Sequence, residues 1–450
     1  MFQRILIANR GEIAYRIAKS CKKLGIMPVF AYSEADKDAK YLRDGVEKIC
    51  IGPGPAVKSY LDSQKLLASA IQKDCQALHP GYGFLSENPY FAYLVRQAHI
   101  SFVGPPPWAI SKMGDKVEAK KTMRQAGVPL LPGNLKKILT IEEGIEEARE
   151  IGYPVLIKAS AGGGGRGMKL CQNEEELRKN FPRASREALQ AFGDPSLYFE
   201  RYLDGAKHIE FQILIDHYGQ GVHLGERECS IQRRHQKLIE ESPSPALSYE
   251  IRSEIGSKAV KALVQGGYSN AGTVEFLSDG QGNLYFMEVN ARLQVEHPVT
   301  EMVVGMDLVE EQIRIAAGHP LSVQQKDIQQ KGHAIEFRIN AEDPRKNFLP
   351  CPGTIQDIKI PEGKGIRFDS HIEKGYQIPP YYDSMIGKLI IWAETREKAI
   401  QKSKDVLKEV RIEGIPTTIP LHLAVLENRE FQNGSYHLHT LEEILKNFNP

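Results

Sequence analysis

The chain of 450 residues has few cysteines, no long hydrophobic run and almost no net charge. Its six cysteines are scattered without a Cys-x-x-Cys pair, so neither a zinc site nor a disulfide framework is predicted. A reducing cytoplasm fits this cysteine usage best. No apolar run approaches the roughly 18 residues that a membrane span needs, and the apolar stretch near the N-terminus is too short for a signal peptide. We therefore expect a cytoplasmic protein with no membrane partner.

Charge and size narrow the class further. The 58 basic and 57 acidic side chains leave a formal net charge of +1, whereas binders of nucleic acid normally carry a basic excess. No nucleic-acid partner is expected. A hydrophobic fraction of 41% with 26% charged residues is ordinary for a globular enzyme, and the length predicts two to three domains.

Strands and helices alternate through residues 1–115. Short apolar strands are predicted at 5–8, 28–32, 76–79 and 101–103, with a helix at 12–24. This alternation predicts a parallel sheet with helices on both faces. The first turn, Asn9–Gly11, has a single glycine and therefore lacks the G-x-G-x-x-G pattern of a dinucleotide site.

The remaining sequence predicts two further regions, with no long linker between them. A helix is predicted at 110–127, followed by a small unit at 131–203 with strands at 153–159, 168–171 and 197–200 and a charged helix from 174. More strands are predicted at 210–216, 222–225, 272–277 and 285–288. The third region begins at 332, with strands at 333–340 and 388–392 and a helix at 395–410. We expect all these units to pack together.

A glycine-rich segment, KASAGGGGRGMKL, occupies residues 158–170. Gly162, Gly164 and Gly167 formally match a dinucleotide loop, but a strand is predicted after them where that loop needs a helix. A P-loop is excluded because Met168 stands where it needs lysine. The pattern instead favours a strand–loop–strand hairpin whose bare backbone can approach phosphates closely; the alternative is a flexible surface turn.

Several motifs together resemble the biotin carboxylases, which are ATP-dependent ligases of the ATP-grasp class. They are HPGYGFLSEN at 79–88, ERECSIQRRHQK at 226–237, EVNARLQVEHPVTE at 288–301, RINAEDP at 338–344 and PPYYDSMIGKLI at 379–390. Lys158 and the glycine hairpin resemble the lid that covers the phosphates in ATP-grasp enzymes. The resemblance spans essentially the whole chain in order, which makes it far more specific than any single motif.

The resemblance implies a fold of mixed α/β and α+β class with three domains. The N-terminal domain, residues 1–115, would be a Rossmann-like parallel sheet of the pre-ATP-grasp type. Residues 116–330 would form the ATP-grasp domain, with 131–203 as its mobile glycine-rich lid. Residues 331–450 would form the C-terminal biotin carboxylase domain, of α+β class.

The same resemblance implies a site for ATP with Mg²⁺ or Mn²⁺. Lys116 and Lys158 would reach the phosphates, and the backbone of Gly164 and Gly165 would cover them. The adenine and ribose would be held by Met168, Glu200, Arg201, Tyr202, Leu203, His208, Gln232 and His235. Relatives often have lysine where Arg201 stands, which a main-chain role tolerates. Taken singly, a lysine or histidine is more often a surface or core residue, so only the joint pattern carries this expectation.

Two carboxylates are candidates for the metal. Glu275 and Glu288 come near the ends of two predicted strands, and Asn290 shares a strand face with Glu288. Oxygen ligands suit Mg²⁺ and Mn²⁺. A glutamate in a strand can simply face solvent, but both sit among apolar neighbours, where an unpaired charge is costly.

The segment NARLQVE supplies the residues predicted to activate bicarbonate. Arg292, Gln294 and Glu296 are spaced by two, so an extended segment would place them on one side. The fork of donors on Arg292 suits a planar oxyanion. By resemblance, Lys237 and the backbone of Val295 complete the bicarbonate site, and Glu296 is the general base that leads to carboxyphosphate.

The biotin side of the site is implied by resemblance as well. Arg338 would stabilise negative charge on the biotin carbonyl oxygen, and Tyr82 would flank the biotin. For Arg338 the alternative is a structural salt bridge with Glu342 or Asp343.

The expected binding partners are inferred from the motifs in the chain and from the resemblance to biotin carboxylases. No Met-Lys-Met lies in a β-rich tail, so biotin is expected on a separate biotin carboxyl carrier protein, with carboxyltransferase subunits completing the complex. A homodimer is also implied, although Lys19, Lys23 and Lys364 place positive charge at the expected contact. The final acceptor is expected to be acetyl-CoA, as in fatty acid synthesis, with pyruvate or another acyl-CoA as the alternative.

Two other functions remain open at this point. The chain could be a different ATP-grasp ligase that transfers an activated carboxylate to an amine. It could also be a catalytically silent nucleotide-binding scaffold, although none of the expected lysines, metal carboxylates or the base is missing.

Overall fold

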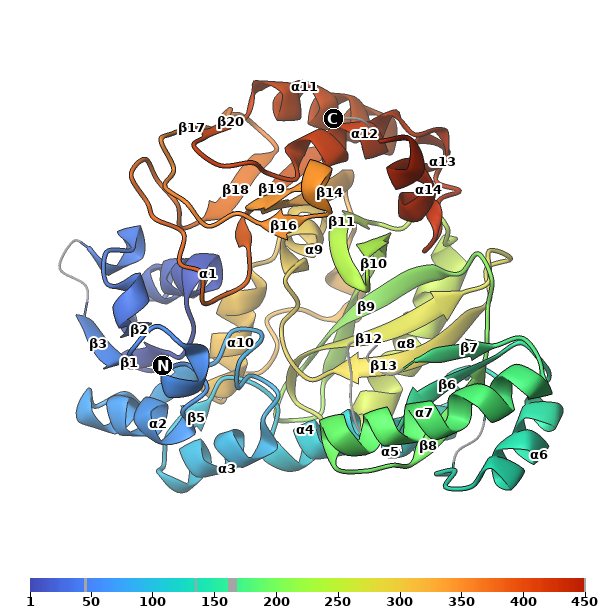
Figure 1. The fold of residues 1–450 in the computed structure, drawn as a ribbon. Coiled ribbons are helices and arrows are strands. Elements are labelled where there is room, and N and C mark those ends of the chain that lie inside the picture. The colour runs from blue at the N-terminus through green and yellow to red at the C-terminus, as the bar shows by residue number, and fades with distance from the viewer. Residues whose placement is uncertain (44–46, 134–135, 161–167, 449–450) are drawn as a thin grey trace.

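The computed structural model describes residues 1–43, 47–133, 136–160 and 168–448. Figure 1 shows the N-terminal region in blue, a small unit at the lower right that contains β6, β7 and β8, and the C-terminal region in orange and red at the top. Strands β9, β12 and β13 run between them. None of the helices in the described ranges is both long and apolar enough to cross a membrane.

The N-terminal region is the predicted parallel sheet, with strand order β3-β2-β1-β4-β5. Sequence reasoning missed the edge strand β3. Its first four residues alternate between half-buried and exposed, and two of them, Glu47 and Lys48, are charged, so the segment does not read as a buried strand. Its elements are β1 (Arg4–Ile7), α1 (Gly11–Lys23), β2 (Met27–Ser33), β3 (Glu47–Gly52), α2 (Ser63–Gln72), β4 (Ala77–His79), α3 (Pro89–Gln97) and β5 (Ser101–Phe102).

The predicted helix at 110–127 is in fact two helices. These are α4 (Pro107–Gly114) and α5 (Lys116–Gln125), which meet at Asp115. The Asp115 side chain accepts hydrogen bonds from the backbone N–H groups of Val117 and Glu118. That N-cap starts a new helix and places Lys116 on its first turn.

The small unit has its own hydrophobic core, made of buried residues in the stretch from Ile138 to Phe199. Its antiparallel sheet has the order β7-β6-β8, and the pairing of β6 with β7 confirms the strand–loop–strand prediction. Gly164 and Gly165, predicted to cover the phosphates, lie outside the described residues. Its elements are α6 (Ile141–Ile151), β6 (Val155–Ala159), β7 (Lys169–Cys171), α7 (Glu174–Phe192) and β8 (Leu197–Arg201).

One antiparallel sheet of eight strands joins the middle of the chain to its C-terminal region, in the order β13-β12-β9-β10-β11-β14-β19-β18. The two regions meet where β11 pairs with β14, with Ile239 opposite Phe337. This continuous sheet confirms that the regions pack together. Its elements and the adjoining helices are β9 (Lys207–Ile215), β10 (Gly221–Arg233), β11 (Gln236–Ser242), α8 (Tyr249–Gln265), β12 (Asn270–Ser278), β13 (Leu284–Asn290), α9 (His297–Val304), α10 (Leu308–Ala316), β14 (His333–Asn340), β18 (Ile366–Ser370) and β19 (Met385–Ala393).

The length of β10 and the existence of β11 were missed. Only 222–225 was predicted as a strand, because Glu226, Arg227 and Glu228 resemble a surface segment. All three are fully buried. The outer elements of the C-terminal region are β15 (Glu342–Asp343), β16 (Leu349–Pro350), β17 (Asp357–Lys359), α11 (Arg396–Glu409), β20 (Arg411–Glu413), α12 (Ile419–Glu427), α13 (Arg429–Asn433) and α14 (Thr440–Asn447).

Candidate active site

A cleft of about 1560 Å³ opens between the N-terminal region, the small unit and the large sheet. Most of the side chains predicted to bind ATP, metal, bicarbonate or biotin line it. They are Tyr82, Lys116, Lys158, Met168, His208, Gln232, His235, Lys237, Glu275, Glu288, Asn290, Arg292, Gln294, Val295 and Arg338. Residues that are more than 250 positions apart in the sequence, such as Tyr82 and Arg338, therefore line a single cleft.

Three lysines converge at the end of the cleft beside the small unit. Lys158 Nζ lies 2.5 Å and Lys120 Nζ 2.6 Å from the two carboxylate oxygens of Glu200. Burial would raise the pKa of Glu200, but Lys158 and Lys120 lower it to about 2. Lys116 Nζ approaches Glu288 at 3.8 Å. The lysine ammonium groups are thus held in place by fixed anions at a position suited to phosphates.

The predicted adenine-binding segment follows directly from Glu200. Glu200 itself turns its side chain to the lysines, so it does more than offer main-chain groups. Arg201 is exposed on the last position of β8, where its side chain is free to vary. The Tyr202 hydroxyl lies 2.9 Å from Nε2 of His439, which ties this segment to the C-terminal region.

Lys237 is the centre of a buried cluster of carboxylates. Its Nζ lies 2.5 Å from Glu210, 3.1 Å from Glu275 and 2.6 Å from Glu296. Burial alone would lower the pKa of Lys237, but these three anions raise it well above its usual value. The lysine is therefore a permanent cation beside the candidate base.

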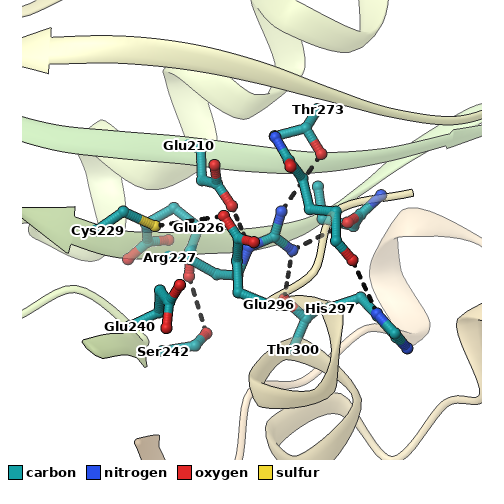
Figure 2. Close-up of polar contacts among 12 residues, drawn as sticks. Glu210, Glu226, Arg227, Cys229, Glu240, Ser242, Thr273, Glu296, His297 and Thr300 are labelled. Atoms are coloured by element: carbon teal, nitrogen blue, oxygen red, sulfur yellow. Dashed lines mark hydrogen bonds and ion pairs between the residues drawn. The ribbon is translucent and has the colours of Figure 1, made fainter. Parts of the chain in front are cut away.

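Arg227 also pairs with this cluster of carboxylates, and Figure 2 shows its guanidinium among Glu210, Thr273 and Thr300. Its guanidinium pairs with Glu210 and donates to Gln212 at 2.9 Å, Thr300 at 2.9 Å and Thr273 at 3.3 Å. The side chain is 0% exposed. Because truncating one partner of such a pair leaves a buried charge, Arg227 stabilises the arrangement of the base.

Glu296, the predicted general base, lies just behind the cleft and is fully buried. Burial would raise its pKa, but Lys237, Arg338 and Arg227 hold that pKa well below its usual value. Arg338 Nη2 lies 2.9 Å from Glu296 and 2.5 Å from Glu240. The alternative of a salt bridge to Glu342 or Asp343 is therefore wrong, because the register of β14 turns Arg338 toward Glu240.

The expectation of an extended segment from Asn290 to Glu296 is also wrong. Strand β13 ends at Asn290, and Glu296, with φ −81° and ψ 11°, is the N-cap residue of α9. Arg292 and Gln294 still meet, because Arg292 Nη1 donates to Gln294 Oε1 at 2.6 Å. Glu296 reaches the site from the helix start rather than by strand alternation.

Comparisons with known proteins agree along the whole chain. Family models match residues 1–110 (biotin carboxylase, N-terminal domain), 115–324 (carbamoyl-phosphate synthase L chain, ATP binding domain) and 336–443 (biotin carboxylase C-terminal domain). The chain is 52% identical to a biotin carboxylase of a Nostoc species over 445 residues, covering 99% of this chain and 100% of that protein. It is 53% identical to biotin carboxylase 1 of Bacillus subtilis, covering 98% of each.

The chain belongs to the biotin carboxylase family. Its members are ATP-dependent ligases of the ATP-grasp class. Among solved structures, biotin carboxylase of Campylobacter jejuni in complex with β,γ-ATP superimposes with a TM-score of 0.95 at 47% identity, covering 98% of this chain and 99% of that one. A second structure is the biotin carboxylase domain dimer of the 2-oxoglutarate carboxylase of Hydrogenobacter thermophilus, in complex with MgADP, ADP and bicarbonate. It superimposes with a TM-score of 0.93 at 48% identity, covering 99% of each chain.

The carboxylates of the enzyme fit a divalent cation. Glu275 and Glu288 are directly opposite each other on β12 and β13, and Glu275 lies within its strand because β12 continues to Ser278. Asn290 Nδ2 donates to Glu275 Oε1 at 2.8 Å. Burial and the nearby Glu275 raise the pKa of Glu288, so an added cation would be favourable there. When bound, such an ion supplies positive charge to the phosphates.

Several site residues escaped sequence reasoning, among them Glu210, Arg227, Glu240, Lys120 and Glu87. Lys120 follows Lys116 by four positions on α5, and that helical spacing was the available signal. Glu87 accepts from Arg292 Nε and from the backbone N–H of Ala291, both at 2.8 Å. It lies in the HPGYGFLSEN motif, but only the fold brings that motif beside Arg292.

Proposed function

We propose that the enzyme carries out the first half-reaction of a multisubunit acyl-CoA carboxylase. It activates bicarbonate with ATP as carboxyphosphate and transfers the carboxyl group to biotin on a separate biotin carboxyl carrier protein. The observation that carries this proposal is the buried Glu296, kept ionised between Lys237 and Arg338 at the inner wall of the cleft.

The proposed roles follow from position. Lys116 and Lys158 hold the ATP phosphates, while Glu275, Glu288 and Asn290 hold Mg²⁺ or Mn²⁺. Arg292, Gln294, Lys237 and the backbone of Val295 bind bicarbonate, and Glu296 removes its proton so that the oxygen attacks the γ-phosphate. Carboxyphosphate then yields CO₂ and phosphate, and the phosphate accepts the N1 proton of biotin.

On the biotin side, Arg338 stabilises the oxyanion that forms when biotin loses its proton. Tyr82 flanks the same part of the cleft. Arg338 is anchored by Glu240 through Nε at 2.6 Å and through Nη2, so its guanidinium is fixed before the substrate arrives. A donor fixed in advance needs little reorganisation as charge develops on the substrate.

The test is bicarbonate-dependent phosphate release from ATP together with fixation of ¹⁴C-bicarbonate into free biotin. Both should require Mg²⁺ or Mn²⁺. ATP turnover that needs an amine acceptor instead would favour another ATP-grasp ligase, and nucleotide binding without turnover would favour a silent scaffold.

For the complex, we propose acetyl-CoA as the final acceptor, with pyruvate or another acyl-CoA as the alternative. Other relatives are named for a 2-oxoglutarate carboxylase and a pyruvate carboxylase, which is why an alternative acceptor is retained. Purifying the complex with its carrier and carboxyltransferase subunits, then supplying acetyl-CoA, pyruvate and propionyl-CoA in turn, decides between them. The cytoplasmic location stays a prediction.

We further propose the domain limits 1–115, 116–330 and 331–450, with 131–203 as a mobile lid, and a homodimer. The positive charge that argues against a dimer is partly offset within the chain, because Lys23 pairs with Glu310 at 2.6 Å. Lys19 lies over the ring of Tyr15. Light scattering at micromolar concentration should give twice the chain mass, and a monomer would contradict the proposal.

A further inference from the structure

Lys388 is a buried charge behind the wall of the site, and the chemistry above leaves it without a role. It lies on β19 within the PPYYDSMIGKLI motif, and its side chain is 0% exposed. Its Nζ donates to the carbonyl oxygen of Val295 at 2.8 Å and lies 3.1 Å from Glu12 Oε1. A buried ammonium is costly unless it is paired and hydrogen-bonded, so these two contacts determine where the lysine can lie.

The surroundings of Lys388 are strongly charged. Arg338 is directly opposite it on β14, and Asp369 is directly opposite on β18. Like charges facing each other across two strands are unfavourable. The buried carboxylates of Glu12 and Asp369 compensate for this repulsion. A methionine or leucine would avoid this repulsion, so packing alone does not explain a lysine here.

The contact with Val295 controls the part of the backbone that carries the base. The carbonyl of Val295 belongs to the peptide that joins Val295 to Glu296, where the chain enters α9. The preceding carbonyl, of Gln294, lies 2.9 Å from Nδ1 of His297. Burial lowers the pKa of His297 well below its usual value, so the ring is neutral and Nδ1–H is the donor. Two successive carbonyls of the proposed bicarbonate segment are thus each held by a buried side chain.

Glu12 extends this support to the biotin side. The same Oε1 atom of Glu12 that faces Lys388 accepts a hydrogen bond from the Tyr82 hydroxyl. The Lys388 ammonium also lies 5.7 Å from the centre of the Tyr82 ring. Glu12 stands on the first turn of α1, Val295 precedes α9, and Lys388 comes from β19. A carboxylate and a backbone carbonyl from two other regions of the fold therefore meet at the Lys388 ammonium.

We propose that Lys388 is a positioning residue that fixes the Val295–Glu296 peptide for bicarbonate and, through Glu12, the Tyr82 side chain for biotin. This inference rests on the proposed function, in which Val295 and Glu296 serve bicarbonate. It assigns Lys388 no contact with ATP, because its partners all lie on the bicarbonate and biotin side of the cleft.

The test uses Lys388→Met, Glu12→Gln and the double variant in the full-length enzyme. Lys388→Met should raise the KM for bicarbonate roughly tenfold or more, as expected for loss of one hydrogen bond from a charged donor. The KM for free biotin should rise as well, while the affinity for MgADP stays within about twofold of wild type.

The double variant separates positioning from stability. Lys388→Met alone leaves the Glu12 carboxylate buried without its cation, which is destabilising. Adding Glu12→Gln removes that charge, so the melting temperature should recover while the KM for bicarbonate stays high, because the Val295 carbonyl still lacks its donor. Recovery of the KM together with the melting temperature would overturn the proposal.

Lys207→Met is the matched control. Lys207 is also buried and also donates to backbone carbonyls, those of Gly434 at 2.8 Å and Tyr436 at 2.6 Å. The Lys207→Met substitution should lower the melting temperature without raising the KM for bicarbonate. A rise equal to that of Lys388→Met would mean general loosening and would overturn the positioning role. A wild-type enzyme with no bicarbonate-dependent turnover would instead refute the proposed function itself.

Discussion

Glu296→Gln is the substitution that tests the base most directly, because it changes charge with almost no change in shape. The carboxylate accepts from Lys237 at 2.6 Å and from Arg338 at 2.9 Å. A glutamine can still accept from Lys237 through its amide oxygen, but its NH₂ group cannot accept from Arg338. The variant therefore loses basicity and about one charged hydrogen bond.

The structural cost should be modest. Lys237 keeps Glu210 and Glu275 as partners, and Arg338 keeps Glu240, so neither cation becomes unpaired. We expect the free energy of unfolding to fall by about 1.5–3 kcal/mol, the range for a hydrogen bond to a charged group. This is below the roughly 3–5 kcal/mol that follows when a buried charge loses its only partner.

The catalytic cost should be larger. Loss of a general base typically lowers the rate by about 10²–10⁴-fold, which corresponds to roughly 2.7–5.4 kcal/mol in the activation barrier. Phosphate release from ATP and ¹⁴C fixation into biotin should fall together, because both depend on carboxyphosphate. The assays are run at saturating ATP and bicarbonate, with MgADP binding measured in parallel.

Glu226→Gln serves as the control for this experiment. Glu226 is equally buried, but it pairs with Arg252 of α8 at 2.5 Å, outside the cleft. It should lose at least as much stability, because Glu226 is the carboxylate with which Arg252 pairs, and it should keep wild-type turnover. If Glu296→Gln retains phosphate release within about threefold of wild type, Glu296 is not the base. If it loses MgADP binding, its role is architectural.

Three further substitutions are predicted to have distinct effects. Burial raises the pKa of Glu228 to about 7, so the wild type loses stability as pH rises from the unfolded-state value near 4.5 toward 7. Relative to wild type, the free energy of unfolding of Glu228→Gln should therefore increase by on the order of 1–3 kcal/mol between pH 5 and pH 8. A difference between the two melting curves that does not change with pH would contradict this. Glu288→Gln should keep the fold but lower bicarbonate-dependent ATP hydrolysis more than about tenfold, because it removes one charge from the metal site; unchanged turnover in saturating Mg²⁺ would refute the assignment. Arg338→Gln should lower biotin carboxylation by about 10²–10³-fold and phosphate release much less, since Glu296 keeps Lys237, and equal losses in both assays would place Arg338 in bicarbonate activation.

The sequence alone indicated many of the elements and the chemistry of the site. Alternating apolar strands predicted the parallel N-terminal sheet, and the glycine segment between two strands predicted the hairpin formed by β6 and β7. These are local properties, set by side-chain periodicity and by backbone freedom. Through their resemblance to biotin carboxylases, the motifs also supplied most of the side chains that line the cleft.

Only the tertiary structure decided how those charges are paired. Most of strand β10 was missed because it contains Glu226 and Arg227, which can be buried only after distant segments provide partners for them, Arg252 from α8 and Glu210 from β9. One partner of Arg338 is Glu240, 98 residues away, because β11 pairs with β14 in one particular register. Lys388 likewise had no visible role until β19 brought it beside Val295 and Glu12. Buried ion pairs depend on geometry over a few ångströms, which packing between distant segments fixes and local sequence does not.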